Sequence, residues 1–136
     1  MMKILRYTAI TAAVLISAGI LIYATSYLVD RYLFPSAPVA KCEATKASRV
    51  ITIQNNTVMP AHVQADTCDT LTIKNTDDKL RRMAFGRHDQ HMAYNGIIEK
   101  PLKKDESFTV TLNKSGTYLV HDHLQEEVGA DFTVNE

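Results

Sequence analysis

The 136-residue chain contains no tryptophan, only two cysteines and no net formal charge. It also lacks internal repeats and low-complexity tracts, which excludes a repeat architecture. From residue 41 onward it carries 12 Lys and Arg against 14 Asp and Glu, a net charge of −2. Because a nucleic-acid-binding surface needs an excess of cations to displace phosphate counterions, we do not expect nucleic acid as a partner.

Formal charge is absent from the 23 residues Tyr7–Val29, most of which are apolar. A bilayer core about 30 Å thick is spanned by about 20 helical residues, so this segment predicts a transmembrane helix within residues 1–31. The cationic side chains of Lys3 and Arg6 favour a cytoplasmic N-terminus. We therefore expect a single-pass protein of the cell membrane whose C-terminal part lies outside the cytoplasm.

Two other processing routes fit this N-terminus less well. A cleaved signal peptide has a shorter apolar run and a small-residue cleavage site directly behind it, whereas the best candidate site, Pro38–Ala40, follows about ten residues later. Lipidation at Cys42 is disfavoured because Lys41, not a small residue, precedes it. Residues 32–48 are then a linker, which its two prolines stiffen by restricting their own φ and the residue before each of them.

Residues 49–136 predict one small all-β domain. Short alternating segments, rich in β-branched side chains and bounded by turn residues, indicate strands. We expect them at Arg49–Ile53, Thr57–Ala65, Thr70–Lys74, Ser107–Leu112, Tyr118–His123 and Asp131–Val134, with Pro60 marking an edge strand or bulge. The stretch Lys79–Glu99 is poorly patterned and is expected to form an irregular loop. Regularly spaced short strands of this kind are typical of an antiparallel Greek-key β-sandwich.

Cys42 and Cys68 are the only cysteines. Outside the cytoplasm such a pair usually oxidises, and a bridge closing a loop of about 26 residues would contribute roughly 3 kcal/mol to stability. We therefore predict a Cys42–Cys68 disulfide, with two unpaired thiols as the alternative. A metal site built on the two cysteines is disfavoured because neither lies near a histidine in the sequence.

Four of the five histidines occur in two short stretches. His121 and His123 lie two residues apart on a predicted strand, so both side chains are on one face, about 6.5 Å apart along the backbone, and Asp122 is on the other. His88 and His91 form a His-x-x-His pair in the expected loop. Each pair alone is also typical of surface histidines, but two pairs in one small domain predict a metal site.

The donor type narrows the choice of metal. Three or four neutral imidazoles suit Cu²⁺, Zn²⁺ or Ni²⁺, and copper binds such ligands most tightly in the divalent series. We expect Cu²⁺ at this site, with zinc as the alternative. Met92 is a weaker candidate as a soft axial ligand, and Glu126 or Glu127 as a ligand or as an acceptor for a ligating imidazole N–H. His62 is expected to be a surface residue.

From Arg49 to Val134 the sequence resembles the cupredoxin superfamily, which consists of small copper-binding Greek-key sandwiches. The segments that carry the likeness occur in the family's order. They are Thr57–Val63, Cys68–Asn75, Leu102–Val110 and Ser115–Tyr118, the last followed by the histidine-rich strand end and Gly129. The resemblance implies the fold and implies copper as the metal.

The chain departs from the usual blue-copper ligand set of that family. Where the family's cysteine, loop histidine and methionine are expected, the chain has His121, Leu124 and Glu127, and the first family histidine falls on Arg81 or Arg82. The His-Asp-His motif is similar instead to a His-x-His subset of cupredoxin-like copper proteins. Without a thiolate ligand the site should not be blue and should transfer electrons poorly.

Three functions follow as hypotheses. The first is a membrane-tethered copper-binding protein that uses His88, His91, His121 and His123 in storage, delivery or protection, which favours a membrane-associated partner. The second is a copper-dependent redox enzyme or electron-transfer protein, which would need an open coordination position. The third is a metal-free interaction domain on a degenerate scaffold. An enzyme is the less expected outcome, and no catalytic residue is assigned.

Overall fold

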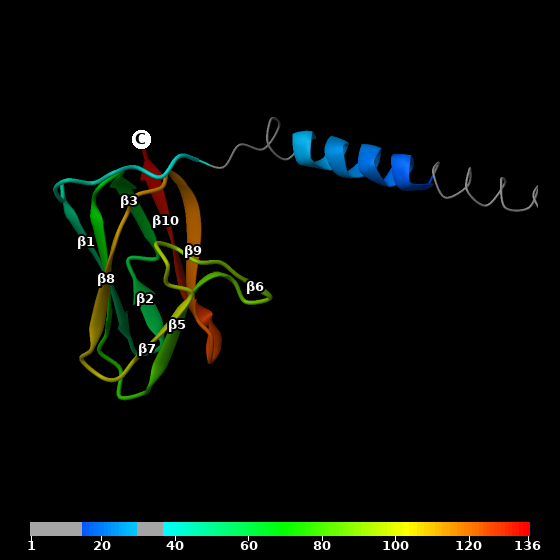
Figure 1. Cartoon of the computed structure of the whole chain (residues 1–136). Helices are drawn as coiled ribbons and strands as arrows, with labels where there is room; N and C mark the ends of the chain where they lie inside the picture. Colours follow the sequence, from blue (N-terminus) through cyan, green and yellow to red (C-terminus); the bar gives the residue numbers. More distant parts are fainter. Residues whose placement is uncertain (1–14, 30–36) are drawn as a thin grey trace, which may run out of the picture. The chain divides into compact units, whose positions relative to one another are not determined.

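The computed structural model describes residues 15–29 and 37–136. These two parts belong to separate units, of which the second, Ala37–Glu136, is a compact β domain (Figure 1). Residues 15–29 are helical. Within the described residues, no helix combines the length and apolar character needed to cross a bilayer. Residues 7–14 of the predicted transmembrane segment lie outside the described residues, so membrane anchoring stays a prediction.

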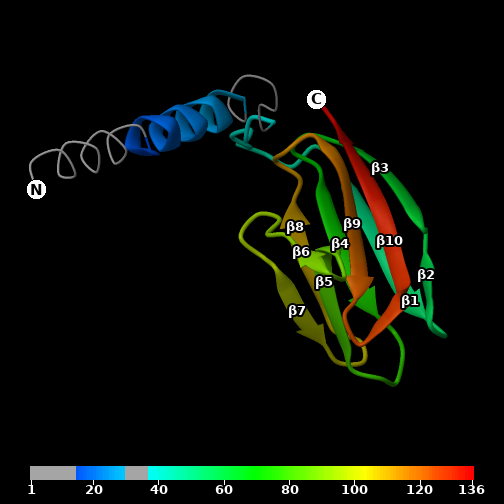
Figure 2. The same ribbon diagram turned by 90° about the vertical axis from the view of Figure 1, so that its right-hand side faces the viewer.

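Ten strands make up the described part of the domain. They are β1 (Ser48–Gln54), β2 (Thr57–Met59), β3 (His62–Asp66), β4 (Thr70–Asn75), β5 (Arg81–Arg87), β6 (Gln90–His91), β7 (Glu99–Leu102), β8 (Ser107–Thr111), β9 (Gly116–Asp122) and β10 (Gln125–Asn135). One sheet has the order β2-β1-β4-β8, and the second has the order β3-β10-β9-β5-β6 with β7 beside β5. The two sheets are the layers of a sandwich (Figures 1 and 2), so the all-β prediction is confirmed.

Some predictions about the strands are wrong. The pairs β1–β4 and β3–β10 are parallel, whereas the sequence predicts antiparallel pairing throughout. The stretch Lys79–Glu99, expected to be irregular, contains β6 and all of β5, which lies between β9 and β7. Its alternation is hard to see in the sequence because a charged residue, Arg81, occupies a fully buried position. The sequence pattern also misses strand β7. Because β7 is an edge strand, it tolerates Pro101, which has no N–H to donate to a neighbouring strand.

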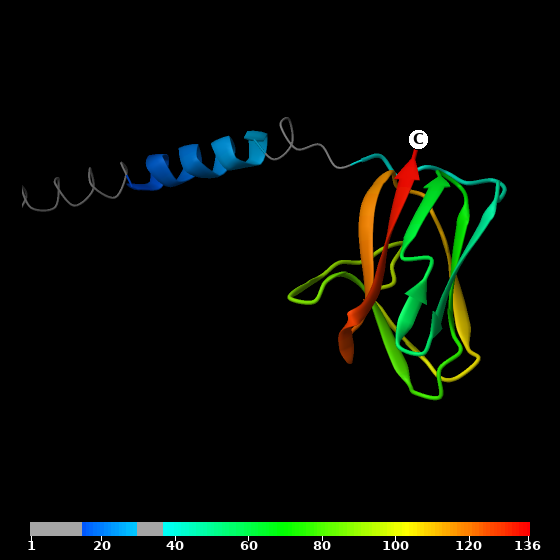
Figure 3. The same cartoon turned by 180° about the vertical axis from the view of Figure 1, so that it is seen from behind.

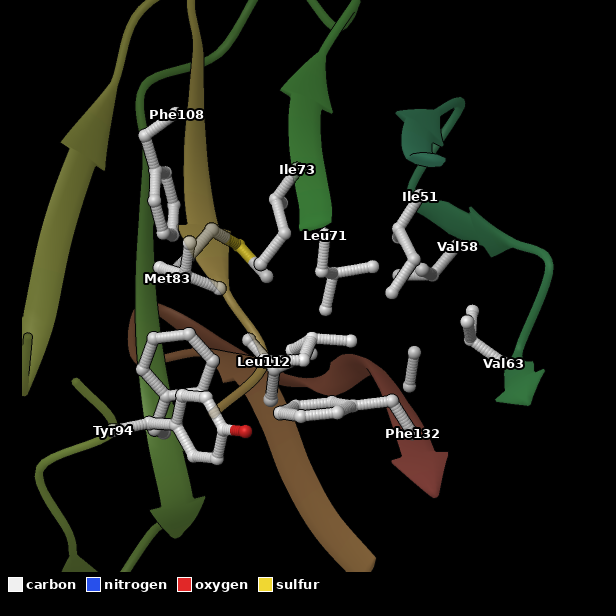
Figure 4. Packing of buried hydrophobic residues seen from close by; sticks show 14 of the residues in the cluster. Ile51, Val58, Val63, Leu71, Ile73, Met83, Tyr94, Phe108, Leu112 and Phe132 are labelled. Atoms are coloured by element: carbon white, nitrogen blue, oxygen red, sulfur yellow. The ribbon is translucent and has the colours of Figure 1, made fainter. Parts of the chain in front are cut away.

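The core fills the space between the two sheets (Figure 4). The first sheet contributes fully buried side chains such as Ile51 and Leu71, and the second contributes Met83 and Phe132. Burying one such side chain stabilises the fold by about 1.5–3 kcal/mol. Because strand side chains alternate between faces, this packing leaves the other face of the second sheet free for polar residues. We call that face, which is turned away from the first sheet, the outer face.

The start of the domain is fixed by a covalent bond and by main-chain contacts. Cys42 and Cys68 form a disulfide with their Cα atoms 5.3 Å apart, as predicted. The Ala40 N–H donates a hydrogen bond to the Asn113 carbonyl at 2.7 Å. The compact unit therefore begins at Ala37, inside the predicted linker. Further along, Pro60 lies where the chain passes from β2 in the first sheet to β3 in the second.

Candidate metal centre

The four predicted histidines lie together on the outer face of the second sheet. Along β9 and just beyond it, His121 and His123 point outward, while the buried Asp122 between them points inward. His91 is the last residue of β6, and His88 lies in the two-residue turn between β5 and β6. The β5–β6 hairpin projects from the domain on the side of β9, away from the first sheet (Figures 1 and 3).

The spacing of the four imidazoles suits a single ion. One candidate ligand nitrogen from each ring lies within 4.8 Å of all the others. Two imidazole nitrogens on one ion lie about 3–4 Å apart, because each metal–nitrogen bond is about 2.0–2.1 Å long. Nδ1 of His123 and Nε2 of His91 are 3.2 Å apart. The nitrogens are therefore about as close together as the ligands of one ion.

His121 is the most constrained of the four. The residue is 7% exposed, and Nδ1 lies 3.0 Å from the Gly86 carbonyl oxygen, to which its N–H donates a hydrogen bond. Nε2 is then the unprotonated nitrogen, and it is buried without a hydrogen-bond partner. Burial lowers the pKa of His121, and the nearby His91 and His88 lower it further, so the ring is neutral. A neutral imidazole with one nitrogen anchored on a carbonyl and the other unpartnered is the usual state of a metal ligand.

Gly86 positions this arrangement and was not predicted to do so. It has a φ of +92°, a left-handed conformation that favours glycine. A Cβ atom there would lie 2.6 Å from the Gln90 carbonyl oxygen and 2.9 Å from the Met92 nitrogen. Glycine thus lets the hairpin fold closely over β5 and lets its own carbonyl reach His121. An isolated glycine inside a strand is the signal that points to such a close approach.

A charged pair borders the cluster on the side of β7 and was also missed. Glu99 forms an ion pair with Arg82, and its other carboxylate oxygen lies 3.9 Å from Nδ1 of His123. The backbone N–H of His123 also donates a hydrogen bond to the Arg82 carbonyl at 2.7 Å. The carboxylate is close enough to favour a cation at the cluster. Only the pairing of β5 with β7 brings Glu99 here, so spacing in the sequence gave no sign of it.

The two glutamates proposed as weaker ligand candidates are near the cluster but outside it. They line a cleft of about 490 Å³ that runs along the outer face beside His121. Within the described residues, the compact group of possible ligands holds the four histidines and neither Glu126 nor Glu127. The Glu127 carboxylate accepts a hydrogen bond from Gln125 at 2.9 Å. A ligand role for either glutamate stays a prediction.

The remaining candidates lie as follows. Met92 directly follows His91 and is 49% exposed, so its thioether is accessible but not enclosed. His62 is exposed on β3 and lies outside the four-histidine group, with Nδ1 2.5 Å from a carboxylate oxygen of Asp131. The prediction that His62 is a surface residue is therefore confirmed.

On the inner side of β5 and β9, the buried charges of Arg81 and Asp122 are paired with each other, and Arg81 also pairs with the partly buried Asp77. We call Asp77, Arg81 and Asp122 the inner ion network. Asp122 accepts hydrogen bonds from an Arg81 terminal nitrogen and from the Arg82 N–H, both at 2.9 Å. The other terminal nitrogen of Arg81 is bound by Asp77 and, at 2.7 Å, by the Asn56 side chain. Only Nε of Arg81 lacks a partner. Arg81, one of the two positions where a family histidine was expected, is thus part of an ion pair.

The pKa values of the network follow from this pairing. Burial alone would lower the pKa of Arg81, but hydrogen bonds to Asp122 and Asp77 raise it above its ordinary value. Burial alone would raise the pKa of Asp77, but hydrogen bonds from Arg81 and from the backbone of Asn56 and Asn55 lower it. Arg81 and Asp77 are therefore charged at neutral pH.

No protein-family model and no curated protein matches the chain. Solved structures are similar to it. A reduced amicyanin variant is 16% identical over 74% of this chain and 99% of its own, with a TM-score of 0.55. A purple cupredoxin from Nitrosopumilus maritimus is 18% identical over 64% of this chain and 99% of its own, with a TM-score of 0.53. At these identities the likeness shows the fold, and the domain has the cupredoxin fold that the sequence resemblance implied.

Proposed function

We propose that this chain is a copper-binding protein whose outer face holds Cu²⁺ through His88, His91, His121 and His123. The observation that carries the proposal is the convergence of four imidazoles around a buried, unpartnered Nε2 of His121. Leaving a buried acceptor unsatisfied costs about 1–3 kcal/mol, which a bound metal would offset. A metal-free interaction domain has no use for this arrangement.

Two arguments favour copper over zinc. Copper is the tightest-binding divalent ion for nitrogen ligands in the first-row series. Three of the similar amicyanin structures are also described as Cu(I) forms. The described ligand group contains imidazoles and no thiolate. When bound, the ion would supply an all-nitrogen Cu²⁺ centre, which favours holding or transferring the ion over shuttling electrons.

The location is part of the same proposal. The uncharged segment Tyr7–Val29 would tether the domain to the cell membrane, with the N-terminus in the cytoplasm and the β domain outside. The Cys42–Cys68 disulfide is consistent with a compartment that does not reduce it. A tethered domain serves a membrane-associated partner better than a diffusing carrier would. Extraction of membranes with alkaline carbonate tests the tether, and release of the protein into the supernatant would contradict it.

Metal binding is tested on the full chain in detergent micelles. We expect the metal-stripped protein to take up one Cu²⁺ with an EPR spectrum of nitrogen ligation, and excess Zn²⁺ to displace it poorly. The variant H121A/H123A should lose this binding. H62A is the matched control, because His62 lies outside the cluster, and it should bind like the wild type. Unchanged affinity in H121A/H123A would contradict the proposal.

A further inference from the structure

The four histidines are held in place to very different degrees. His121 is buried and anchored on the Gly86 carbonyl. His123 and His91 contact each other through ring nitrogens 3.2 Å apart, and both are partly buried. His88 is the only exposed member of the group. Three of the four histidines are therefore held by an anchor: the ring of His121 by the Gly86 carbonyl, and the backbones of His91 and His123 by their pairing with β5.

Within the described part of the chain, the His88 ring has ring contacts but no hydrogen bond or ion pair. It stacks on His123, with centroids 4.9 Å apart and an angle of 23° between the planes. Its backbone lies in the turn of the β5–β6 hairpin, beyond the Arg87–Gln90 pair that ends the ladder. The neighbouring Arg87–Asp89 ion pair is largely exposed, and such pairs restrain a loop weakly. Rotation of His88 away from the cluster therefore breaks no hydrogen bond.

From this gradient we infer that His88 is a detachable fourth ligand and that His91, His121 and His123 form a fixed platform. The inference rests on the proposed function. Copper exchange with an acceptor then takes place at the position of His88, where an incoming imidazole or thiolate replaces it. The other three cannot leave as easily, because the His121 ring is hydrogen-bonded to the Gly86 carbonyl and the backbones of His91 and His123 are paired with β5. The acceptor therefore approaches over the β5–β6 turn.

The experiment compares single variants of the full chain in detergent micelles. H88A should still bind Cu²⁺, with affinity lowered by at least the roughly 10–100-fold that loss of an outer-shell partner costs, and should transfer it to EDTA faster than the wild type. Added imidazole should change the EPR spectrum of copper-loaded H88A to the wild-type form and should leave the wild-type spectrum unchanged. H121A should lose copper, and imidazole should not restore it, because that position is buried.

H91A is the matched control within the same hairpin. It should lose more affinity than H88A and should respond less to imidazole. An H88A protein with the wild-type spectrum and transfer rate would show that His88 is not a ligand and would overturn the inference. So would an H88A protein that loses copper as completely as H121A, or equal rescue of H88A and H91A. Wild-type protein that takes up no Cu²⁺ contradicts the proposed function itself, which separates that outcome from these.

Discussion

His121 and Asp122 are neighbours on β9, but their side chains point to opposite faces of one sheet and meet opposite conditions. On the inner face, Asp122 is paired with Arg81 and with backbone N–H groups. On the outer face, His121 has one nitrogen anchored and the other buried without a partner. Buried acceptors that are paired serve the fold, whereas a buried acceptor nitrogen left without a partner is available to bind a cation, which the unpartnered Nε–H of Arg81 is not. Strands β5 and β9 thus carry a structural ion network on the inner face and a candidate metal site on the outer face.

The largest expected effect comes from breaking the inner face. Arg81→Ala leaves the buried Asp122 and the partly buried Asp77 without their cation, which should lower the free energy of unfolding by about 3–5 kcal/mol. Denaturant unfolding of the metal-free protein measures this. Arg82→Ala is the matched control, since Arg82 is 45% exposed and pairs with Glu99 at the surface, and it should cost less than about 1 kcal/mol. Equal losses in the two variants would show that the inner ion network does not hold the sheet.

The next largest effect concerns the candidate metal site on the outer face. This site should raise the free energy of unfolding only when copper is bound. At a free Cu²⁺ concentration 100 times the dissociation constant, the wild type should gain about 2.7 kcal/mol. H121A should gain almost nothing, and H62A should gain as much as the wild type. Unfolding curves with and without copper check this. A similar gain in H121A would place the copper site elsewhere on the molecule.

The strand pattern of the sequence predicted much of the fold and failed where charge is buried. Alternating β-branched residues located β1, β4, β8 and β9 to within a few residues. The pattern failed at β5, because Arg81 occupies a core position that an alternation rule reserves for apolar residues. A buried arginine is stable only when partners from other strands pair with it, and a local pattern does not contain those partners.

The candidate site was predictable in its members but not in its construction. Two histidine pairs of chemically suitable spacing pointed to the four residues that the structure brings together. The role of Gly86 and the proximity of Glu99 depend on which strands are neighbours, and that follows only from the tertiary fold. The alternation on β9 did separate His121 and His123 from Asp122, because a two-residue period is a local property.

A smaller effect is expected from Gly86→Ala, which changes the outer face alone. The added Cβ meets the Gln90 carbonyl and the backbone at φ +92° is strained, so unfolding should be easier by about 1–3 kcal/mol. Copper affinity should also fall, because the anchor of His121 shifts. Gly96→Ala is the control, since Gly96 has a similar φ of +80° but open space around it. If both variants keep wild-type copper affinity, the close approach at Gly86 does not position the site.

The smallest expected change is the response of the inner ion network to mild acid. The contributions of the two faces to the free energy of unfolding should therefore differ in their pH dependence. The pKa of Asp77 is lowered by its partners from a reference of 3.8, so its contribution to stability is fully present above pH 3.8 and is lost as pH falls through the lower, folded value. The difference in unfolding free energy between the wild type and D77N, measured without copper, should therefore stay constant from pH 7 to about 4.5.

The stability gained from copper should instead disappear below about pH 6, because imidazoles must be neutral to bind a metal and an ordinary imidazole titrates near 6.5. Denaturant unfolding across this pH range, with and without Cu²⁺, measures both quantities. If the D77N difference already shrinks between pH 7 and 5.5, a histidine and not Asp77 controls the inner face, and the separation of the two faces fails.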